Sequence, residues 1–540
     1  MSSRSKKRHS RKPKSDAIAV LSSKRSPLFA ATFVPEPGLE FGNHQHLVDP
    51  RVGLGIYGPV DRGSPTRRTP IRLGLIGSGP LIDKVQQWLS RCHGEVDPIR
   101  RSLLRGQIVT RRTDPAVVPR FPGIRAVFDT DFVLSPQHVE TLTSTELDEV
   151  RNNFELYEPR VTRMGEILGR RLSVIADKAT VPDVVLVALP SDLRKLCTTP
   201  TKHKRRGRRP RTLADILRQS LDKDDSNGQL NLLDVPAANH ISLEDHDHEH
   251  IVLHSALKIH GMRTGLPTQL IWEGTLDGVG VEDDATCAWN ICSGIYYKAN
   301  NELWRLTGLT TNSCFVGLSF YKDRRDETLR CCVAQAFSDR GEGLVIRSEP
   351  FAWRNEHERT PHLTREMASS MLRNVLAAYC EHLKVQPGRI VVHKWQRFWA
   401  EERAGFEDAL KAANVHSHDF VAFGSRGLRF YRAGNEPPIR GTYIALGEGE
   451  GLLFTRGYVP FLRRYPGMRV PRPLEIIEHH GSASMTQIAQ EILALTKLDW
   501  NTTMFAGKEP ITTAFAREVG QILSELPPNT EPKRSYRFYM

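Results

Sequence analysis

Two stretches of the chain are mainly apolar without a regular alternation, and the second is also rich in β-branched residues; this pattern limits the possible folds more than any other. They are IRLGLIGSG at residues 71–79 and PDVVLVALP at residues 182–190. A strand that is apolar on both sides must be covered on both faces, which is typical of parallel sheets flanked by helices. LIDKVQQWL, at residues 81–89, follows the first stretch with helical spacing, so a strand–turn–helix unit is expected there. The pattern predicts an α/β fold.

The second half of the chain predicts another α/β domain, beginning near Cys287. CFVGLSFYKD at residues 314–323 and LRCCVAQAF at residues 329–337 have the pattern of two hairpin strands. Residues 364–383 form an amphipathic helix pattern that begins at a threonine cap. RIVVHKWQRF, at residues 389–398, is expected to be a strand, and AEERAGFEDALKAA after it a further helix. Strands that alternate with helices in this way indicate a layered α/β architecture.

Polar side chains converge in the segment from His254 to Lys298. His254 and Lys258 are four residues apart and share one face of a helix. A glycine and a proline then end that helix, and Thr268 and Gln269 lead into an apolar strand. Lys298 follows CAWNICSGIYY, a small and apolar run expected to be a buried helix. Two ammonium groups, an amide and an imidazole suit a phosphate monoester, although lysines at helix ends are also commonly solvated.

The net charge favours a polyanionic partner. The formal charge is +13 and the pI is near 9.4, and basic surfaces gain affinity for phosphates through counterion release. Part of this charge lies in two runs, at residues 4–14 and 202–211, which are expected to be solvated and flexible.

Composition indicates a globular protein with a cytoplasmic location. The chain has 540 residues with 39% hydrophobic residues, enough for two to four domains. It shows neither an apolar run long enough for a membrane span nor an apolar core for secretion near its start. The eight cysteines lack paired CxxC spacing and are expected to be buried thiols.

The segment from His254 to Lys298 resembles the MID domain of Argonaute proteins, which holds the 5′ phosphate of a guide strand. In that family a helix carries a Tyr or His and a Lys, a Thr-Gln pair follows, and a later Lys completes the pocket. The resemblance assigns guide 5′-phosphate binding to a set of five residues. They are His254, Lys258, Thr268, Gln269 and Lys298.

The whole chain from about Phe33 to Met540 resembles a short prokaryotic Argonaute. EPGLEFG at residues 36–42 and DPRVGLGIYGP at residues 49–59 resemble the opening of these proteins. The resemblance implies a Rossmann-like MID domain followed by an RNase H-like PIWI domain. The expected parts are a disordered basic tail at 1–25, a Pro- and Gly-rich extended segment at 26–70, the MID domain at 71–285 and the PIWI domain at 286–540.

The resemblance also implies a PIWI domain without nuclease activity. RNase H-like nucleases need several carboxylates on two divalent ions. Ser319 stands where cleaving Argonautes have the first Asp, Trp395 follows His393 and Lys394 where a second Asp is expected, and Phe515 aligns with the final Asp or His. The nearby carboxylates are expected to be ordinary surface charges rather than a displaced site. They are Asp323, Asp326, Glu401 and Glu402.

The last residues of the chain imply a metal in the phosphate pocket. In relatives the terminal carboxylate enters the MID pocket and helps to hold a Mg²⁺ that bridges the guide phosphate. The aromatic and apolar end, with Tyr536, Phe538, Tyr539 and Met540, is expected to be docked rather than frayed. The expected ligands of Mg²⁺ are Gln269 and the carboxylate of Met540.

The function implied by the resemblance is guide-directed recognition without cleavage. A small 5′-phosphorylated guide RNA would pair with a complementary single-stranded DNA target, so that base pairing supplies the specificity. A separate APAZ-containing effector, a TIR or sirtuin NADase or a nuclease, would form a heterodimer with the chain in defence against plasmids or phage. A larger oligomer on activation is a further expectation. No membrane partner is expected.

Several alternatives stay open at the level of sequence. The chain could be an active guide-directed nuclease or a non-specific basic nucleic-acid-binding protein. Gly77 and Gly79 form part of a dinucleotide fingerprint whose third glycine is replaced by Ile82, so a nicotinamide-dependent oxidoreductase is a further rival. His246, His248 and His250 invite a metal site, although histidines alternating along a polar loop are more often solvated.

Overall fold

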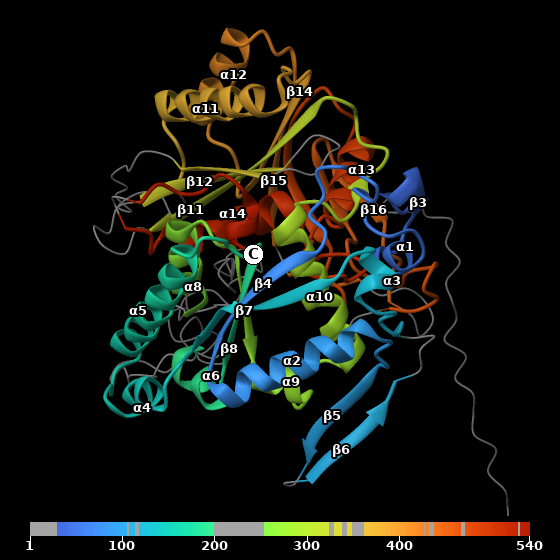
Figure 1. Ribbon diagram of the computed structural model, residues 1–540. Coiled ribbons are helices and arrows are strands. Elements are labelled where there is room, and N and C mark those ends of the chain that lie inside the picture. Colours follow the sequence, from blue (N-terminus) through green and yellow to red (C-terminus); the bar gives the residue numbers. More distant parts are fainter. Residues whose placement is uncertain are drawn as a thin grey trace, which may run out of the picture.

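The fold consists of two α/β modules that meet along one side, as the computed structural model shows (Figure 1). The structure describes residues 30–104, 107–113, 118–198, 253–322, 329–336, 343–347, 361–425, 427–430, 437–465, 470–527 and 530–540. The basic tail, the basic loop, the histidine cluster at 246–250, Asp323 and Asp326 lie outside these residues. Within them, no helix is long and apolar enough to cross a membrane.

The first module is built on a four-stranded parallel sheet. Its strands are β4 (Ile71–Gly77), β7 (Phe132–Thr141), β8 (Val184–Leu189) and β9 (Thr268–Trp272), in the order β7-β4-β8-β9. Every neighbouring pair in this sheet is parallel. The two apolar stretches form the strands β4 and β8, which confirms the predicted parallel sheet, and they are neighbours in it.

Helices cover both faces of this sheet. Val185, Val187 and Leu189 of β8 pack in one cluster with α5 (Tyr157–Ala176) and α8 (Leu253–Thr264). Val184, Leu186 and Ala188 pack on the other side with α2 (Gly79–His93) and α10 (Asp284–Asn300). Burial of alternate residues on opposite faces explains why β8 is apolar at every position.

Shorter elements complete the first module. They are β5 (Ile99–Leu104), β6 (Gln107–Arg112), α3 (Ile124–Phe128), α4 (Ser144–Asn152), α6 (Ser191–Thr198) and α9 (Glu273–Asp277). The helix α4 begins with a capping box, in which Thr143 and Glu146 satisfy each other's backbone N–H groups. The strands β5 and β6 form a separate two-stranded sheet that projects from the module (Figure 1).

The second module contains a nine-stranded mixed sheet in the order β1-β16-β17-β18-β15-β14-β11-β12-β13. Its central strands are β11 (Ser313–Lys322), β14 (Arg389–Trp395) and β15 (Ser417–Gly424), which run parallel to one another. β12 (Leu329–Ala336) returns beside β11 as its antiparallel hairpin partner, as expected. The outer strands are β13 (Gly343–Arg347), β16 (Thr442–Gly447), β17 (Glu450–Leu453) and β18 (Leu474–Gly481).

Two pairs of helices cover this sheet. α11 (Arg365–Leu383) and α12 (Ala400–Ala412) pack over Val316, Val392 and other residues of one face. α13 (Met485–Leu495) and α14 (Ile511–Leu523) share a core with Phe315 and Val391, which point to the other face. The predicted cap of α11 is confirmed, because the Thr364 side chain accepts a hydrogen bond from Met367 N.

The N-terminal segment is not wholly extended, so that prediction was wrong. Residues Pro50–Tyr57 form helix α1. Asp49 is its N-cap, and the Asp49 side chain accepts hydrogen bonds from Arg51 N and Val52 N. Proline suits the first helical position because its missing N–H needs no partner there. Gly53 allows α1 to pack directly on Phe41. The glycines serve close packing here rather than an extended chain.

The extended parts of this segment join both modules. β1 (Ala31–Phe33) pairs with β16 at the edge of the nine-stranded sheet. β2 (Leu39–Phe41) and β3 (Gln45–Leu47), joined by the short turn η1 (Gly42–His44), form a small sheet with β10 (Arg305–Leu306). The segment therefore belongs to the folded body of the protein.

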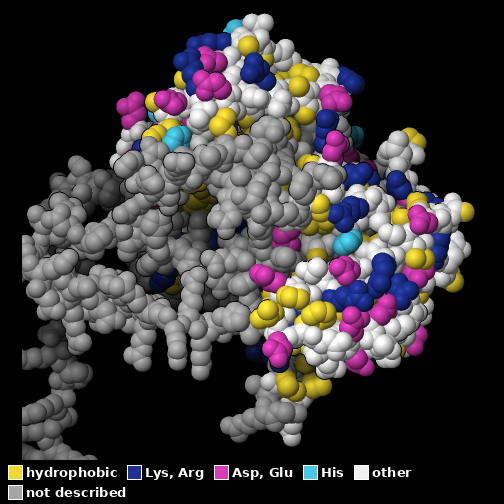
Figure 2. Space-filling view, turned by 90° about the vertical axis from the view of Figure 1, so that its left-hand side faces the viewer, with side chains coloured by type: hydrophobic (Ala, Val, Ile, Leu, Met, Phe, Trp, Pro, Cys, Tyr) yellow, Lys and Arg dark blue, Asp and Glu magenta, His cyan; other side chains and the backbone are white. Residues whose placement is uncertain are grey.

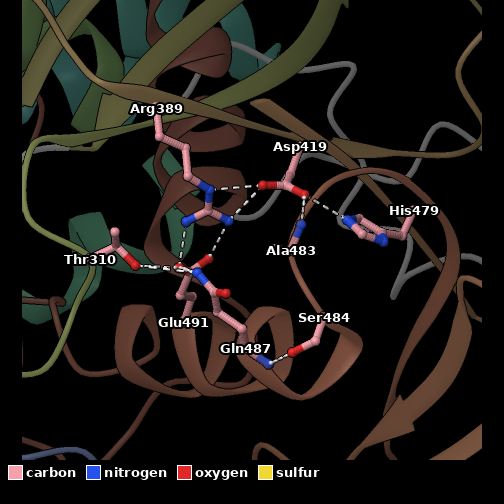
Figure 3. A network of polar contacts seen from close by, with 8 residues as sticks. All are labelled: Thr310, Arg389, Asp419, His479, Ala483, Ser484, Gln487 and Glu491. Atoms are coloured by element: carbon pink, nitrogen blue, oxygen red, sulfur yellow. Dashed lines mark hydrogen bonds and ion pairs between the residues drawn. The ribbon is translucent and has the colours of Figure 1, made fainter. Parts of the chain in front are cut away.

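A buried polar network ties the central strands to α13 (Figure 3). Arg389 donates to Asp419 Oδ2 at 2.8 Å and forms an ion pair with Glu491 at 2.5 Å. Asp419 Oδ1 also accepts from Ala483 N at 3.0 Å and lies 2.8 Å from His479 Nε2. Each charged side chain has several partners, which is what burial of charge requires.

Candidate phosphate-binding site

A pocket of about 240 Å³ opens between the two modules, where α8 and β9 meet the last residues of the chain. The end of the chain lies at this junction (Figure 1). The pocket is lined by His254, Lys258, Gln269, Leu270, Trp272, Asn501 and Met540. Four of the residues chosen from sequence thus meet in one cavity, namely His254, Lys258, Gln269 and Met540.

Lys258 is held in place by the strand beside it. Its side chain is buried on α8, and Nζ donates a hydrogen bond to the carbonyl oxygen of Thr268 at 2.6 Å. The Thr268 side chain packs against Gly261, where an added Cβ would lie 3.2 Å from Thr268 Cγ2. Thr268 therefore positions Lys258 through its backbone carbonyl. The Thr268 hydroxyl points to α8 and has no hydrogen-bond partner among the described residues.

Lys298 lies one layer behind the pocket wall. It is fully buried near the end of α10, and its Nζ donates to Gln269 Oε1 at 2.8 Å. Gly294, one turn earlier, leaves room for this arrangement. A Cβ there would lie 3.5 Å from Gln269 Oε1 and 3.7 Å from both Asn501 Oδ1 and Lys298 Nζ. The polar ends of these three side chains therefore gather over Gly294.

The two lysines at the pocket are not paired with acidic side chains of the described residues. Among the described residues, no Asp or Glu side chain forms an ion pair with Lys258 or Lys298. Burial lowers the pKa of Lys298 to about 7. Burial, together with the nearby Lys298, lowers the pKa of Lys258 well below its ordinary value. An anion beside these two buried amines would favour their charged forms.

His254 has a different setting from the two lysines. Part of His254 is exposed to solvent, yet surrounding protein atoms desolvate its imidazole. Lys258 and Lys298 also repel the protonated form of the ring. Both effects lower the pKa of His254, so the ring is neutral at pH 7. A neutral imidazole still donates one N–H hydrogen bond to an anion.

Three pocket residues were missed by reasoning from sequence. Leu270 and Trp272 follow Gln269 on β9, and a purely polar search passes over them. Asn501 lies more than 200 residues away, in the LDWNTT segment, and only the tertiary fold brings it to α8 and β9. No local pattern marks such a residue.

The predicted Mg²⁺ ligands share this pocket. Gln269 and Met540 both line it, and an amide oxygen and a carboxylate are the hard donors that Mg²⁺ prefers. These residues fit the metal in chemical type. Elsewhere, the described residues contain no group of three or more His, Cys, Asp or Glu side chains that could hold a metal ion.

The three positions linked to lost catalytic ligands lie on one face of the second sheet. Gly317 contacts the backbone of Thr512 in α14, so Ser319, two residues later on β11, faces α14 as well. On the neighbouring β14, Trp395 Nε1 donates to Glu509 Oε2 at 3.1 Å just before α14. Phe515 stacks on Tyr536. A serine, a tryptophan bonded to Glu509 and a stacked phenylalanine therefore occupy these positions.

Two acidic residues beside this sheet behave differently from each other. Glu401 is exposed, as expected. Glu402 is fully buried and pairs with Lys394 at 2.7 Å, so the expectation of a surface charge was wrong for this residue. Its carboxylate also accepts hydrogen bonds from Leu363 N and Trp399 N. Glu402 therefore joins α12 to β14.

Three solved structures resemble the whole chain. Clostridium butyricum Argonaute, bound to a guide DNA and a 19-mer target DNA, has 14% identity and a TM-score of 0.59, covering 93% of this chain and 54% of that one. Aa-Ago with externally bound siRNA has 14% identity and a TM-score of 0.54, covering 94% and 56%. A. aeolicus Argonaute has 13% identity and a TM-score of 0.52, covering 93% and 54%. No protein-family model and no curated protein matches the chain.

These similarities and the two modules define an Argonaute-like MID–PIWI fold. We refer to the first module as MID-like and to the second as PIWI-like. The chain spans about half the length of the Argonautes that it matches, as the covered shares of 54% and 56% show.

Proposed function

We propose that this chain loads a small 5′-phosphorylated RNA as a guide and uses it to recognise complementary single-stranded DNA. The pocket between the modules supports this proposal most directly. It brings Lys258, Gln269 and His254 together around a cavity backed by Lys298. A phosphate monoester carries close to two negative charges and would supply the anion that the two buried amines lack.

The proposed roles follow from the geometry of each residue. Lys258 and His254 contact phosphate oxygens, and Gln269 contributes its amide. Lys298 raises the local positive potential and orients Gln269 through their hydrogen bond. Mg²⁺, held by Gln269 and the carboxylate of Met540, would neutralise further phosphate charge when bound. Asn501 is well placed to donate to the guide backbone, because it lines the same cavity.

The proposal includes target binding without cleavage. Ser319, Trp395 and Phe515 supply no carboxylate at the expected catalytic positions, which supports a chain that recognises rather than cuts. The outcome of recognition would then be activation of an associated APAZ-containing effector, a TIR or sirtuin NADase or a nuclease, in defence against plasmids or phage. This part rests on the resemblance to short Argonautes.

The first experiment compares one RNA with a 5′ phosphate and with a 5′ hydroxyl, in filter binding to the full chain with Mg²⁺ at moderate salt. We expect clearly tighter binding of the phosphorylated strand. Equal affinity with steep salt dependence would instead indicate a general basic nucleic-acid-binding protein.

The second experiment tests the absence of cleavage. The guide-loaded chain is incubated with labelled complementary DNA and RNA in Mg²⁺ or Mn²⁺, and the targets are expected to stay intact. Guide-dependent cleavage at a single position would replace the proposal with an active nuclease.

A further inference from the structure

The strands β5 and β6 form an arm, defined as residues 99–104 and 107–112, that extends from the first module (Figure 1). Its two strands pair in register, with Leu103 opposite Ile108 and Arg100 opposite Arg111. The phosphate pocket does not involve this arm. Its structure therefore needs a separate explanation.

The base of the arm is fixed to the body of the module. Arg101 Nη1 forms an ion pair with Asp284 of α10 at 2.7 Å, and Gly280 N donates to Arg101 O at 3.2 Å. Arg112 pairs with Asp97 at 2.8 Å. These contacts hold the direction of the arm, and they occupy the outer edge of β5. Among the described residues, β6 pairs only with β5, so the outer edge of β6 is open.

The arm exposes aliphatic side chains on both faces. Leu103 is 63% exposed, Ile108 59% and Val109 45%. Leu103 and Ile108 lie opposite each other on one face, and Val109 points to the other. A two-stranded hairpin is marginally stable alone, and exposed aliphatic clusters on a soluble protein commonly mark binding surfaces.

The arm also carries two arginines that have no ion-pair partner within the described part of the chain. Arg100 and Arg111 are exposed and lie directly opposite each other, an arrangement that destabilises a hairpin. Neither forms an ion pair with a described residue, whereas Arg151, Arg163 and Arg171 of α4 and α5 all do. On the face shown in Figure 2, Lys and Arg side chains are likewise interspersed with Asp and Glu. Arg100 and Arg111 differ from the three arginines of α4 and α5 in having no ion-pair partner among the described residues.

We propose that the arm binds a partner protein through an extended acidic segment of that partner, which adds as a strand along the open edge of β6. Backbone hydrogen bonds to β6 would supply affinity. In an alternating segment the carboxylates would lie on the face of Arg100 and Arg111, and the aliphatic side chains on the opposite face with Leu103 and Ile108. A second copy of the chain is disfavoured because its own arm brings the same positive charge. Single-stranded nucleic acid is disfavoured because IRRSLLRGQIVTRR contains no aromatic residue for base stacking.

The test uses the full chain and a fluorescent peptide of alternating Glu and Val, compared with one of alternating Lys and Val. The anisotropy of each peptide is measured against wild type, the double variant Arg100→Glu/Arg111→Glu, and Val109→Lys. The charge-matched control is Arg170→Glu/Arg373→Glu, since both residues are exposed helix positions away from the arm. Circular dichroism and melting of each variant show whether it is folded.

We expect the acidic peptide alone to bind wild type and the control. Reversing Arg100 and Arg111 should weaken that binding by about tenfold, because two attractions become two repulsions. Affinity for a 5′-hydroxyl RNA should not change. The proposal is overturned by equal peptide binding to all variants, or by no binding to wild type. It is also overturned if the arm variant loses RNA affinity by the same factor, or if sedimentation shows a wild-type dimer that the arm variant lacks.

Discussion

Tyr536 stacks on Phe515 with ring centroids 3.4 Å apart and planes 13° from parallel. Phe515 belongs to α14, and Tyr536 lies four residues before Met540, which lines the pocket. Arg534 O also accepts from Val345 N of β13 at 3.0 Å. The last residues of the chain are therefore fixed to the PIWI-like module and carried from there into the pocket of the MID-like module.

Replacing Tyr536 with Ala should release this segment and weaken guide binding. The substitution removes a buried ring, a change that typically costs about 3–5 kcal/mol where the site cannot collapse. We expect faster amide exchange at residues 536–540 and lower affinity for a 5′-phosphorylated strand. Hydrogen exchange and filter binding measure the two effects. Tyr536→Phe is the matched control, because it keeps the ring and loses only the 3.4 Å contact with Glu518, so its affinity should match that of wild type.

Lys258→Met should weaken binding of the phosphorylated guide by about 1.5–3 kcal/mol, the range for hydrogen bonds to charged groups. The free protein should be as stable as wild type or more so, because a buried amine with a lowered pKa is replaced by an apolar side chain of similar length. Titration with 5′-phosphate and 5′-hydroxyl strands separates the phosphate contribution. Lys84→Met provides the control, since Lys84 pairs with Glu273 on the surface. Unchanged affinity of the Lys258 variant would refute the pocket assignment.

Local patterns in the sequence predicted most of the elements that surround the pocket. The continuous apolar run of β8, the cap at Thr364 and the i,i+4 pair on α8 all depend on nearby residues. Helix α1 was missed because its glycines indicate turns, while the Asp49 cap and the Pro at the first helical position indicate a helix. When the local signals for a turn and for a helix oppose each other, tertiary packing decides which of the two forms. In α1 the deciding contact is that of Gly53 with Phe41.

Features that depend on distant contacts could not be read in this way. Glu402 sits in an ordinary surface-helix pattern, and only the position of Lys394 on β14 explains its burial. Asn501 reaches the pocket through the packing of the two modules. Thr268 and Lys298 were assigned to the same site, and the structure shows each of them hydrogen-bonded to a residue that lines the pocket, Lys258 and Gln269 respectively. Sequence spacing can identify the residues that gather at such a site. It does not show which of them line the cavity and which lie behind those that do.

Guide affinity should fall as pH rises from 6.5 to 9. The pKa of Lys298 is about 7 in the free protein, and a bound phosphate dianion would raise it. The complex then binds more protons than the free protein, so affinity is full below about pH 7 and is lost by up to about tenfold per pH unit above it. The range begins at pH 6.5 because the phosphate itself gains a proton near pH 6.

Binding of phosphorylated and hydroxyl-ended RNA across this range provides the measurement. The hydroxyl-ended strand should show a much flatter pH profile. Lys298→Met should flatten the profile of the phosphorylated strand as well, because it removes the titrating amine. An equal slope for both strands would show that the effect does not arise in the pocket.

Asp419→Ala should destabilise the PIWI-like module by about 3–5 kcal/mol, the cost of removing one partner from a buried ion pair. The change leaves Arg389 paired only with Glu491, and it also removes the contacts to His479 and Ala483 N (Figure 3). Asp408→Ala is the matched control, because its partner Arg365 is exposed and such pairs contribute about 0–1 kcal/mol.

Hydrogen bonds from Ala483 and Arg389 and the contact with His479 hold the pKa of Asp419 below 3.8 despite the opposing effect of burial. The ionised Asp419 carboxylate therefore contributes fully to the free energy of unfolding above pH 3.8. This contribution is lost as the pH falls through the lower pKa that Asp419 has in the folded state. Urea unfolding of both variants at pH 7 and pH 4.5 should show the same large difference, and a cost below 1 kcal/mol for Asp419→Ala would mean that water replaces the carboxylate.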